Sequence, residues 1–306
     1  MTDLTIYKDR TFLLFGKLRL IRQRHTMKLP TDWSEMSHRQ AIIFIRMLFF
    51  PTFKDQNTNE YTWRFKNRFL KYIMMDARDR IGRRYFTESD FFTFGDYPIH
   101  MLMDKIAGIF KKDAAFPAIK KILVKLTHFY LPGHNMQNSS FIEFAMAEEY
   151  YYQICKGINT SENITSLCAT LVRPQRTGWW FIRRFLKNNG DNRIEYDSRT
   201  ADQAAKLMTD EVTEDIKFYV FYYYKAVRKN LIELYPAIFQ REDQGEADAN
   251  GNNYRFIGAL HQTAQDGAFG DWNACALENM HNILHYVNFQ QDKAKEASDR
   301  LSRAAS

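Results

Sequence analysis

Glycine and proline are scarce in this sequence of 306 residues, which contains only 13 Gly and 7 Pro. Average usage would place about 37 of these two residues in a chain of this length. A β-sandwich needs a turn roughly every ten residues, and long disordered regions are usually rich in both residues, so the shortage argues against both. The composition therefore favours a mostly α-helical protein.

Cysteine and long apolar runs are also scarce. Three cysteines are an odd number and too few for a disulfide scaffold in a chain of this size. The richest apolar stretch, residues 218–224, is far shorter than the roughly 20 residues that span a bilayer. The N-terminal residues lack the small-residue cleavage site of a signal peptide. We therefore expect a reduced, cytoplasmic protein without a membrane segment.

Aromatic residues are abundant, with 25 Phe, 17 Tyr and 5 Trp, and hydrophobic residues make up 45% of the chain. These residues are numerous enough to form a large core packed with rings. The formal net charge is +7, but the basic residues are spread along the sequence. A dedicated nucleic-acid binder usually concentrates such an excess on one face or in a tail, so the charge is only a weak indication of that function.

The sequence divides into four parts. Residues 1–29 show the two-residue alternation of an extended segment or hairpin. Residues 30–240 form a predicted helical core domain, and residues 241–253 form a polar linker without large apolar side chains. Residues 254–306 form a C-terminal helical segment. The predicted fold class is thus a mostly α, multi-helix bundle with a short N-terminal extended or β segment.

Local signals place the helices within these parts. Ser37 with Gln40, and Ser140 with Glu143, match the capping box at the start of a helix. The clearest helical spacing lies in 215–235, whose apolar positions surround the helix and predict a central location. The other predicted helices cover 41–49, 60–76, 98–110, 117–130, 141–154, 161–172, 254–265 and a long last helix from about residue 271. Beyond Phe289 this last helix is polar and should project into solvent.

One weak candidate for a metal site lies on the predicted last helix. Glu278, His281 and His285 stand at i, i+3 and i+7, and a Glu-x-x-His pair on one helix occurs in di-metal carboxylate bundles. Such bundles need a matching pair from another helix, and the sequence offers none at the right spacing. We favour a solvated helix face, expect no cofactor, and keep a metal-dependent helical enzyme as the weakest alternative. No other catalytic motif is present.

Two stretches combine rings with cations, as single-stranded nucleic-acid binders do. They are residues 63–71, followed by further arginines, and residues 178–187. The nucleic-acid alternative uses the cations of the first stretch: Arg64, Lys66, Arg68, Lys71, Arg83 and Arg84. Helical spacing, however, places Phe65, Phe69 and Ile73 together and the cations mostly elsewhere, which is typical of an ordinary amphipathic helix. Nucleic-acid binding is therefore an alternative rather than the preferred function.

Four motifs in a fixed order carry a resemblance. They are Pro30-x-x-Trp33-x-Glu35-Met36-Ser37-x-x-Gln40, Leu167-x-Ala169-Thr170-Leu171-x-Arg173-Pro174, Tyr235-Pro236-x-x-Phe239, and Gly267-x-Phe269-Gly270 before a long helix. In this order the chain resembles poorly characterised helical proteins encoded in phage and prophage tail modules. The resemblance implies a tail-assembly chaperone or tail accessory protein.

The preferred function is therefore a non-enzymatic assembly factor or virion accessory protein that binds other proteins. Its partners would be phage or prophage structural or assembly proteins in the host cytoplasm or the particle, and a homo-oligomer is an alternative. Tryptophan and arginine dominate interface hot spots, so the Trp179–Trp180 pair is either an exposed anchor or part of the core. The candidate partner-binding residues are Trp33, Trp179, Trp180, Arg183, Arg184 and Phe269.

Overall fold

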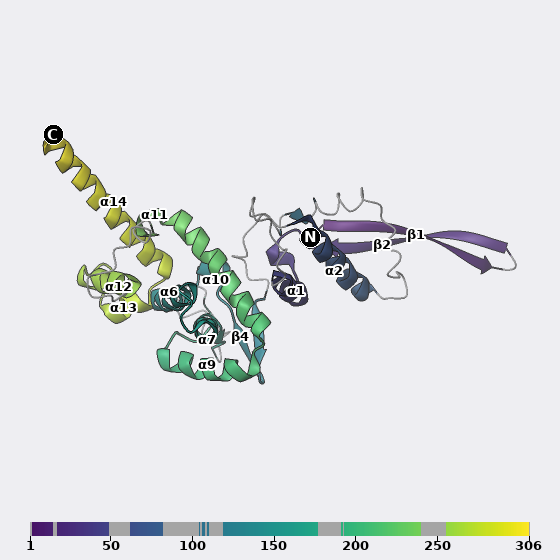
Figure 1. Cartoon of the computed structure of the whole chain (residues 1–306), viewed down its shortest axis with the longest axis horizontal. Helices are drawn as coiled ribbons and strands as arrows, with labels where there is room; N and C mark the ends of the chain where they lie inside the picture. The colour runs from purple at the N-terminus through teal and green to yellow at the C-terminus, as the bar shows by residue number, and fades with distance from the viewer. Residues whose placement is uncertain are drawn as a thin grey trace. The chain divides into compact units, whose positions relative to one another are not determined.

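The structure is a computed structural model and describes residues 2–14, 17–48, 62–81, 104, 106, 107, 109, 119–176, 191, 193–239 and 255–305. Its contacts divide the chain into two compact units, residues 1–113 (unit 1) and 114–306 (unit 2). Both units contain helices, and the fold is mostly α, as predicted (Figure 1). The division lies inside the helical domain predicted for 30–240. The predicted linker 241–253 lies outside the described residues.

Unit 1 begins with a long β-hairpin. Strand β1 (Thr2–Leu14) pairs with the antiparallel strand β2 (Lys17–Leu29), from Thr2 opposite Leu29 to Leu14 opposite Lys17. The prediction of an extended segment or hairpin over residues 1–29 is thereby confirmed as a hairpin. Pro30, which lacks a backbone N–H for a further ladder bond, follows the second strand.

The helical part of unit 1 comprises the 3₁₀ helix η1 (Trp33–Glu35), α1 (His38–Leu48) and α2 (Trp63–Ile81). The predicted capping box is present before α1, because Ser37 N donates to Gln40 Oε1 at 2.9 Å and Gln40 N donates to Ser37 Oγ at 3.3 Å. The Phe44 ring lies edge-on to Phe65 and Phe69 at centroid distances of 5.3 and 4.9 Å. The helix predicted at 98–110 falls almost entirely outside the described residues.

Unit 2 contains the long helix α10 (Glu214–Leu234), whose buried side chains include Tyr219, Tyr223 and Leu231. The predicted helix is confirmed, but Lys225, Lys229 and Ile232 form an exposed face, so the helix is not surrounded on all sides as predicted. Helix α7 (Thr160–Leu171) contacts α6 (Phe141–Cys155), α9 (Ser198–Glu211) and α10. The remaining helices are η2 (His134–Met136), α11 (Pro236–Phe239), α12 (Arg255–Gln265), α13 (Trp272–Leu277) and α14 (Met280–Ala305). None of the helices in the described part of the chain is long and apolar enough to cross a bilayer.

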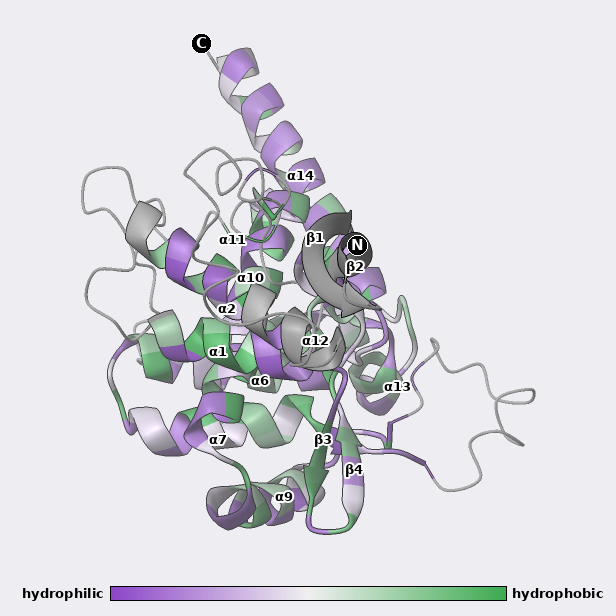
Figure 2. Ribbon diagram, turned by 90° about the vertical axis from the view of Figure 1, so that its right-hand side faces the viewer, coloured by the Kyte–Doolittle hydropathy of each residue, from purple (hydrophilic) through white to green (hydrophobic). Residues whose placement is uncertain are grey.

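A small antiparallel sheet replaces the helix predicted over 117–130, so that prediction is wrong. Strands β3 (Lys121–Val124), β4 (Thr127–Tyr130) and β5 (Arg173–Pro174) lie in the order β3-β4-β5. The side chains of β3 alternate, with Ile122 and Val124 buried and Leu123 58% exposed. Two-residue alternation fits one sheet face against a core and the other against solvent. The hairpin lies beside α9 (Figure 2).

The last predicted helix is interrupted, which corrects the prediction of one helix from about residue 271. Helix α13 ends at Leu277, and Glu278 is extended with ψ 155° before α14 begins at Met280. This break frees the backbone to bond elsewhere: the Glu278 carbonyl accepts from Phe141 N at 2.9 Å, and Met280 N donates to the Ser139 carbonyl at 3.1 Å. These bonds attach the start of α14 to the start of α6.

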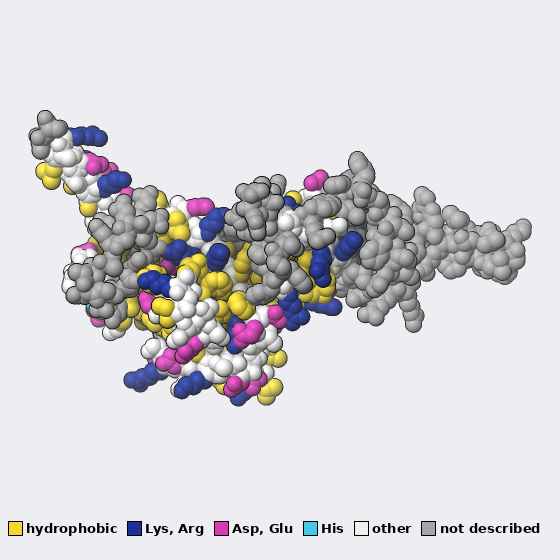
Figure 3. Space-filling view, in the orientation of Figure 1, with side chains coloured by type: hydrophobic (Ala, Val, Ile, Leu, Met, Phe, Trp, Pro, Cys, Tyr) yellow, Lys and Arg dark blue, Asp and Glu magenta, His cyan; other side chains and the backbone are white. Residues whose placement is uncertain are grey.

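The far end of α14 extends from the rest of unit 2 and carries exposed Lys, Arg, Asp and Glu side chains (Figure 3). The predicted projection beyond Phe289 is confirmed. The turn predicted before the last helices is also present, since Gly267 and Gly270 have φ of +68° and +102°. Such φ values favour glycine because a Cβ would clash with the backbone.

Helix α9 is absent from the helices predicted above, although its start carries a capping signal. Asp197 precedes it, and the Asp197 carboxylate accepts from Arg199 N at 2.7 Å and Thr200 N at 3.3 Å. These bonds satisfy two backbone N–H groups that have no partner within the helix. The cap therefore fixes where α9 begins relative to the chain before it.

We predict that Asp197→Ala lowers the free energy of unfolding by about 0.5–2 kcal/mol, because both capping bonds are lost. Urea titration followed by circular dichroism measures the effect. Asp197→Asn is the matched control: it keeps a capping oxygen and should retain most of the stability. Equal losses in the two variants would contradict the capping role.

Candidate functional site

A cluster of four charged side chains, the ionic cluster, lies inside unit 2. Its members are Glu143 of α6, Arg173 of β5, Asp191 and Arg193; Glu143 and Arg193 are fully buried. Arg193 Nη1 lies 2.8 Å from Glu143 Oε1, Arg173 Nη2 lies 2.6 Å from Glu143 Oε2, and Arg193 Nε lies 2.8 Å from Asp191 Oδ1. Each carboxylate accepts hydrogen bonds from both guanidinium groups, so the two negative charges balance the two positive ones.

The second predicted capping box, Ser140 with Glu143, is wrong. Ser140 is the residue before α6, but it makes no side-chain capping bond, and its Oγ is buried without a hydrogen-bond partner. The Glu143 carboxylate binds the two arginines instead of reaching back to the Ser140 N–H. Bonds to the guanidinium groups also compensate two buried positive charges, which a bond to a backbone N–H would not do, so the distant partners prevail over the local one.

The pKa values of the two guanidinium groups in the ionic cluster shift in opposite directions. Burial lowers the pKa of Arg193, but the carboxylates of Glu143 and Asp191 outweigh this effect and the net shift is upward. The pKa of Arg173 is lowered, mainly by burial and against the opposing charge of Glu143. Both arginines thus depend on Glu143 for compensation of their charge.

The ionic cluster also joins segments of the backbone. Arg193 Nη1 donates to the Leu171 carbonyl at 2.8 Å, and Arg193 Nη2 donates to Ser139 Oγ at 3.1 Å. Ile194 N donates to the Pro174 carbonyl at 2.9 Å. The chain before residue 177 and after residue 190 is therefore held together. The candidate partner-binding residues between these points lie outside the described residues: Trp179, Trp180, Arg183 and Arg184.

An apolar pocket of about 150 Å³ lies beside the ionic cluster, and Arg173 contributes to both. Two rim residues, Ile194 and Leu207, are 39% and 38% exposed. An engineered apolar cavity of about 150 Å³ is large enough to hold benzene. The pocket therefore has room for one aromatic or aliphatic side chain. Its apolar lining comes from the sheet, α7, the chain after the ionic cluster, and α9: Phe129, Ala169, Pro174, Ile194, Ala201, Ala204 and Leu207.

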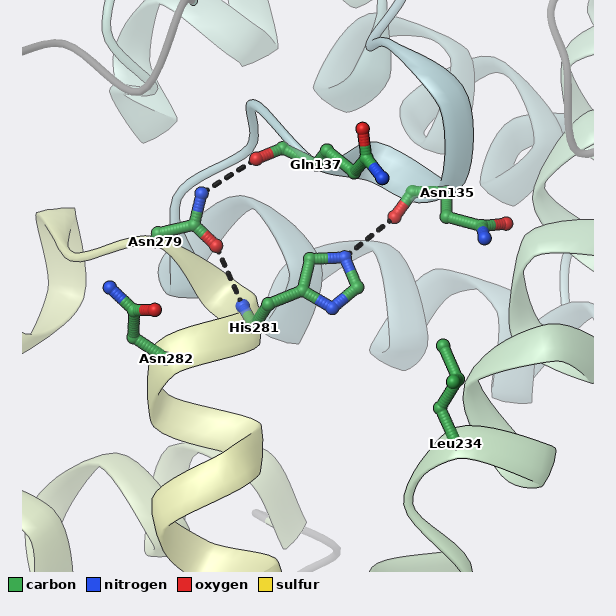
Figure 4. Close-up of a pocket in the computed structure, with 6 residues that line it drawn as sticks. All are labelled: Asn135, Gln137, Leu234, Asn279, His281 and Asn282. Carbon is green, nitrogen blue, oxygen red and sulfur yellow. Dashed lines mark hydrogen bonds between the residues drawn. The ribbon is translucent and has the colours of Figure 1, made fainter.

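A second pocket is open, polar and about 380 Å³ in volume (Figure 4). It lies where η2, the end of α10 and the start of α14 meet. The Asn279 side chain links its walls, donating to the Gln137 carbonyl at 2.6 Å and accepting from His281 N at 2.9 Å. Asn135 has a φ of +49°, a left-handed conformation that costs energy for a residue other than glycine. The lining residues are Asn135, Gln137, Leu234, Asn279, His281 and Asn282.

The His281 ring is held at both nitrogens. Nε2 lies 3.0 Å from the Asn135 carbonyl and Nδ1 lies 2.9 Å from the Tyr235 hydroxyl. Because a carbonyl only accepts, we assign the proton to Nε2, and neutral Nδ1 accepts from Tyr235. Burial lowers the pKa of His281, and the Asn135 bond partly opposes this shift. Burial and the nearby His281 also lower the pKa of His134.

The weak metal candidate is not assembled on one helix. Glu278 lies between α13 and α14, where its Oε1 accepts from Asn282 Nδ2 at 2.7 Å. Both ring nitrogens of His281 are engaged, and His285 is exposed. No group of three or more His, Cys, Asp or Glu side chains in the described ranges could hold a metal ion. These bonds give Glu278 and His281 structural roles.

The candidate nucleic-acid residues of α2 lie on an amphipathic helix. Phe65, Phe69 and Ile73 are buried, whereas Arg68 and Lys71 are exposed. The predicted separation of rings from cations on this helix is therefore confirmed. Lys66 is half-buried. The side chain of Arg64 lies outside the described part of the chain, as do Arg83 and Arg84, and nucleic-acid binding stays a prediction.

Two other candidate partner-binding residues can be placed. Trp33 is only 2% exposed, and its indole N–H donates to the Ile109 carbonyl at 3.0 Å. It also packs edge-on against Phe44 at 4.8 Å. Trp33 is therefore a core residue of unit 1, which corrects its assignment as a partner contact. Phe269 is partly exposed beside Tyr286, with 5.7 Å between ring centroids.

Comparison of the chain with models of known protein families, with curated proteins and with solved structures finds no match. The contacts described above are therefore the basis for assigning a function.

We predict that Glu143→Gln lowers the free energy of unfolding by about 3–5 kcal/mol, because it leaves two buried guanidinium groups short of compensating charge. Chemical denaturation measures the change. Glu149→Gln is the matched control on the same helix: its side chain is more exposed and, among the described residues, accepts a hydrogen bond from Gln153 alone. That control should change stability by less than about 0.5 kcal/mol. Similar values for both variants would contradict the role of the ionic cluster.

We also predict that stability falls as the pH drops below the ordinary histidine pKa of 6.5. The folded-state pKa of His281 lies below this value, so in the interval between the two the unfolded chain binds the additional proton and is favoured. Denaturation midpoints measured from about pH 5 to 7.5 test the sign. His281→Gln should weaken this dependence, and His134 and His38 should account for part of the remainder. An unchanged profile in His281→Gln would contradict the assignment.

Proposed function

We propose that this chain binds another protein and works without catalysis, using the apolar pocket between α9 and the small sheet. The observation that carries this proposal is the partly exposed apolar rim of the pocket, formed by Ile194 and Leu207. Apolar side chains that gather at a concave surface are typical of interaction sites. The pocket volume fits one apolar side chain rather than a large ligand.

The neighbouring hairpin extends the apolar surface. Phe129 of β4 lines the pocket, and the same hairpin carries Leu126, 96% exposed, and Leu123, 58% exposed. Hydrophobic side chains reach the surface of this part of unit 2 (Figure 3). A partner covering the pocket and hairpin would remove these side chains from water, which contributes about 25 cal/mol for each Å² of apolar surface buried.

The surroundings of the pocket favour a preformed site. Arg173 is held by the ionic cluster, and α9 is fixed at its start by the Asp197 cap. Rigid walls reduce the entropy lost when a partner side chain is ordered on binding. A single aromatic or aliphatic anchor on the partner would therefore contribute much of the affinity, as in other interfaces with hot spots.

The specific form of the proposal is a phage or prophage assembly factor or virion accessory protein. The order of the four sequence motifs supports this form. A tail-assembly chaperone would shield apolar segments of a long tail protein, and the apolar pocket and hairpin suit such a task. The proposed partners are accordingly phage or prophage structural or assembly proteins.

The experiment places a photo-reactive phenylalanine analogue at Leu207 and co-expresses the protein with the products of its neighbouring genes. We predict a crosslink to one structural or assembly protein. Lys206 is the matched control position, because it is exposed on the same helix but outside the pocket lining. Leu207→Asp should weaken the complex at least about tenfold, since a charge in an apolar pocket loses its hydration.

Lys206→Asp should leave the affinity unchanged. Equal crosslinking from both positions, or no crosslink to any co-expressed protein, would contradict a pocket-directed protein-binding function. Mass spectrometry of the crosslinked peptide identifies the segment of the partner that enters the pocket.

A further inference from the structure

The outer edge of β3 presents unpaired backbone groups in the described part of unit 2. In antiparallel pairs, alternate residues direct their N–H and C=O groups towards the partner strand, and the others direct them away. Leu131 N donates to the Lys120 carbonyl at 3.1 Å, so Lys120, and by alternation Ile122 and Val124, bond towards β4. Lys121 and Leu123 therefore direct their backbone groups away from β4.

The order β3-β4-β5 makes β3 an edge strand of its sheet. The edge has a defined start, because Ile119 N donates to the Tyr219 hydroxyl at 3.0 Å. Helix α9 contacts β3, and residues of both α9 and the sheet line the apolar pocket. No described segment forms a backbone hydrogen bond with Lys121 or Leu123 at this edge, and both side chains are exposed.

The side chains along this edge define the chemistry of a partner. Lys120, Lys121 and Lys125 are all exposed, and no carboxylate among the described residues forms an ion pair with any of them. Leu123 and Leu126 place apolar surface between and beside these cations. Edge lysines discourage pairing with a second copy of the same strand, because like charges would face one another.

We propose that the β3 edge binds an extended segment of a partner protein in which acidic and apolar residues alternate. The segment adds a strand to the sheet, with main-chain bonds to Lys121 and Leu123. Because successive side chains of a strand point to opposite faces, its carboxylates lie on the face of Lys121 and Leu123 and pair with the lysines, and its apolar side chains lie on the face of Ile122 and Val124. This proposal rests on the protein-binding function proposed above and names the chemistry of the partner.

The test uses a fluorescent eight-residue peptide in which Glu alternates with Val, measured by anisotropy against the full chain. The comparison peptide alternates Lys with Val. We expect the acidic peptide to bind at least about tenfold more tightly, with affinity that falls as salt increases. Hydrogen exchange should show that the acidic peptide protects the amides of Lys121 and Leu123.

Two variants separate strand addition from other modes of binding. Leu123→Pro removes an N–H that faces away from β4, and an edge strand tolerates proline at such a position, so the fold should survive while affinity drops at least about tenfold. The double variant Lys121→Glu/Lys125→Glu should lose affinity for the acidic peptide and gain it for the basic one. This charge reversal does not depend on the tolerance of proline.

Failure of the acidic peptide to bind, equal binding of both peptides, or undiminished binding by the charge-reversed variant would overturn the proposal. Leu207→Asp should bind the acidic peptide as the unmodified chain does, because Leu207 lies at the pocket rim. Peptide binding without a crosslink at Leu207 would support the β3 edge and contradict the pocket. A crosslink at Leu207 without peptide binding would do the reverse.

Discussion

The buried contact between Glu143 and Arg193 is the constraint on which unit 2 depends. Moving an ion of this kind from water into a protein interior costs several kcal/mol, and the cost is offset only when its hydrogen-bonding groups find partners at good geometry. Such bonds specify distances and angles, whereas apolar packing tolerates repacking. The start of α6, the end of α7 and the chain after Asp191 are therefore restricted to one arrangement. Arg173, which forms part of the wall of the apolar pocket, is held in this same arrangement.

Helix α6 carries a second buried carboxylate that also bonds to a distant segment of the chain. Glu148 accepts from the Tyr224 hydroxyl at 2.8 Å and from Arg228 Nε at 3.1 Å, both on α10. Five residues separate Glu148 from Glu143, which is roughly 140° around a helix. The two carboxylates consequently face different neighbours, one the ionic cluster and the other α10. Polar bonds thus determine the rotation of α6 about its axis, which its largely apolar surface would leave poorly specified.

The contrast between α10 and the hairpin shows how much of the fold the sequence determines locally. The apolar spacing of α10 continues over its whole length, and the predicted helix is correct. Ile119, Ile122, Leu123 and Leu126 also fall at i, i+3, i+4 and i+7, the spacing of a helical stripe. The structure buries Ile122 and Val124 instead, and it leaves the two leucines exposed. Strand β4 of this hairpin pairs with β5, which comes much later in the chain. The spacing of nearby residues therefore could not determine whether this segment forms a helix or a hairpin.

The candidate site was less predictable because its charges are distant in the sequence. The local pattern assigns Glu143 to a capping box, and nothing near Asp191 or Arg193 indicates a partner. One signal was present: Glu143 stands among apolar residues on a helix that must be buried, and a charge in that position requires compensation from elsewhere. Leu123 and Leu126 are the opposite case, because they are apolar but exposed, and no side chain in the described part of the chain covers them. In both cases the side chain needs a contact that its neighbours in the sequence do not provide. A distant segment supplies the opposite charge for Glu143, and another protein can remove the leucines from water.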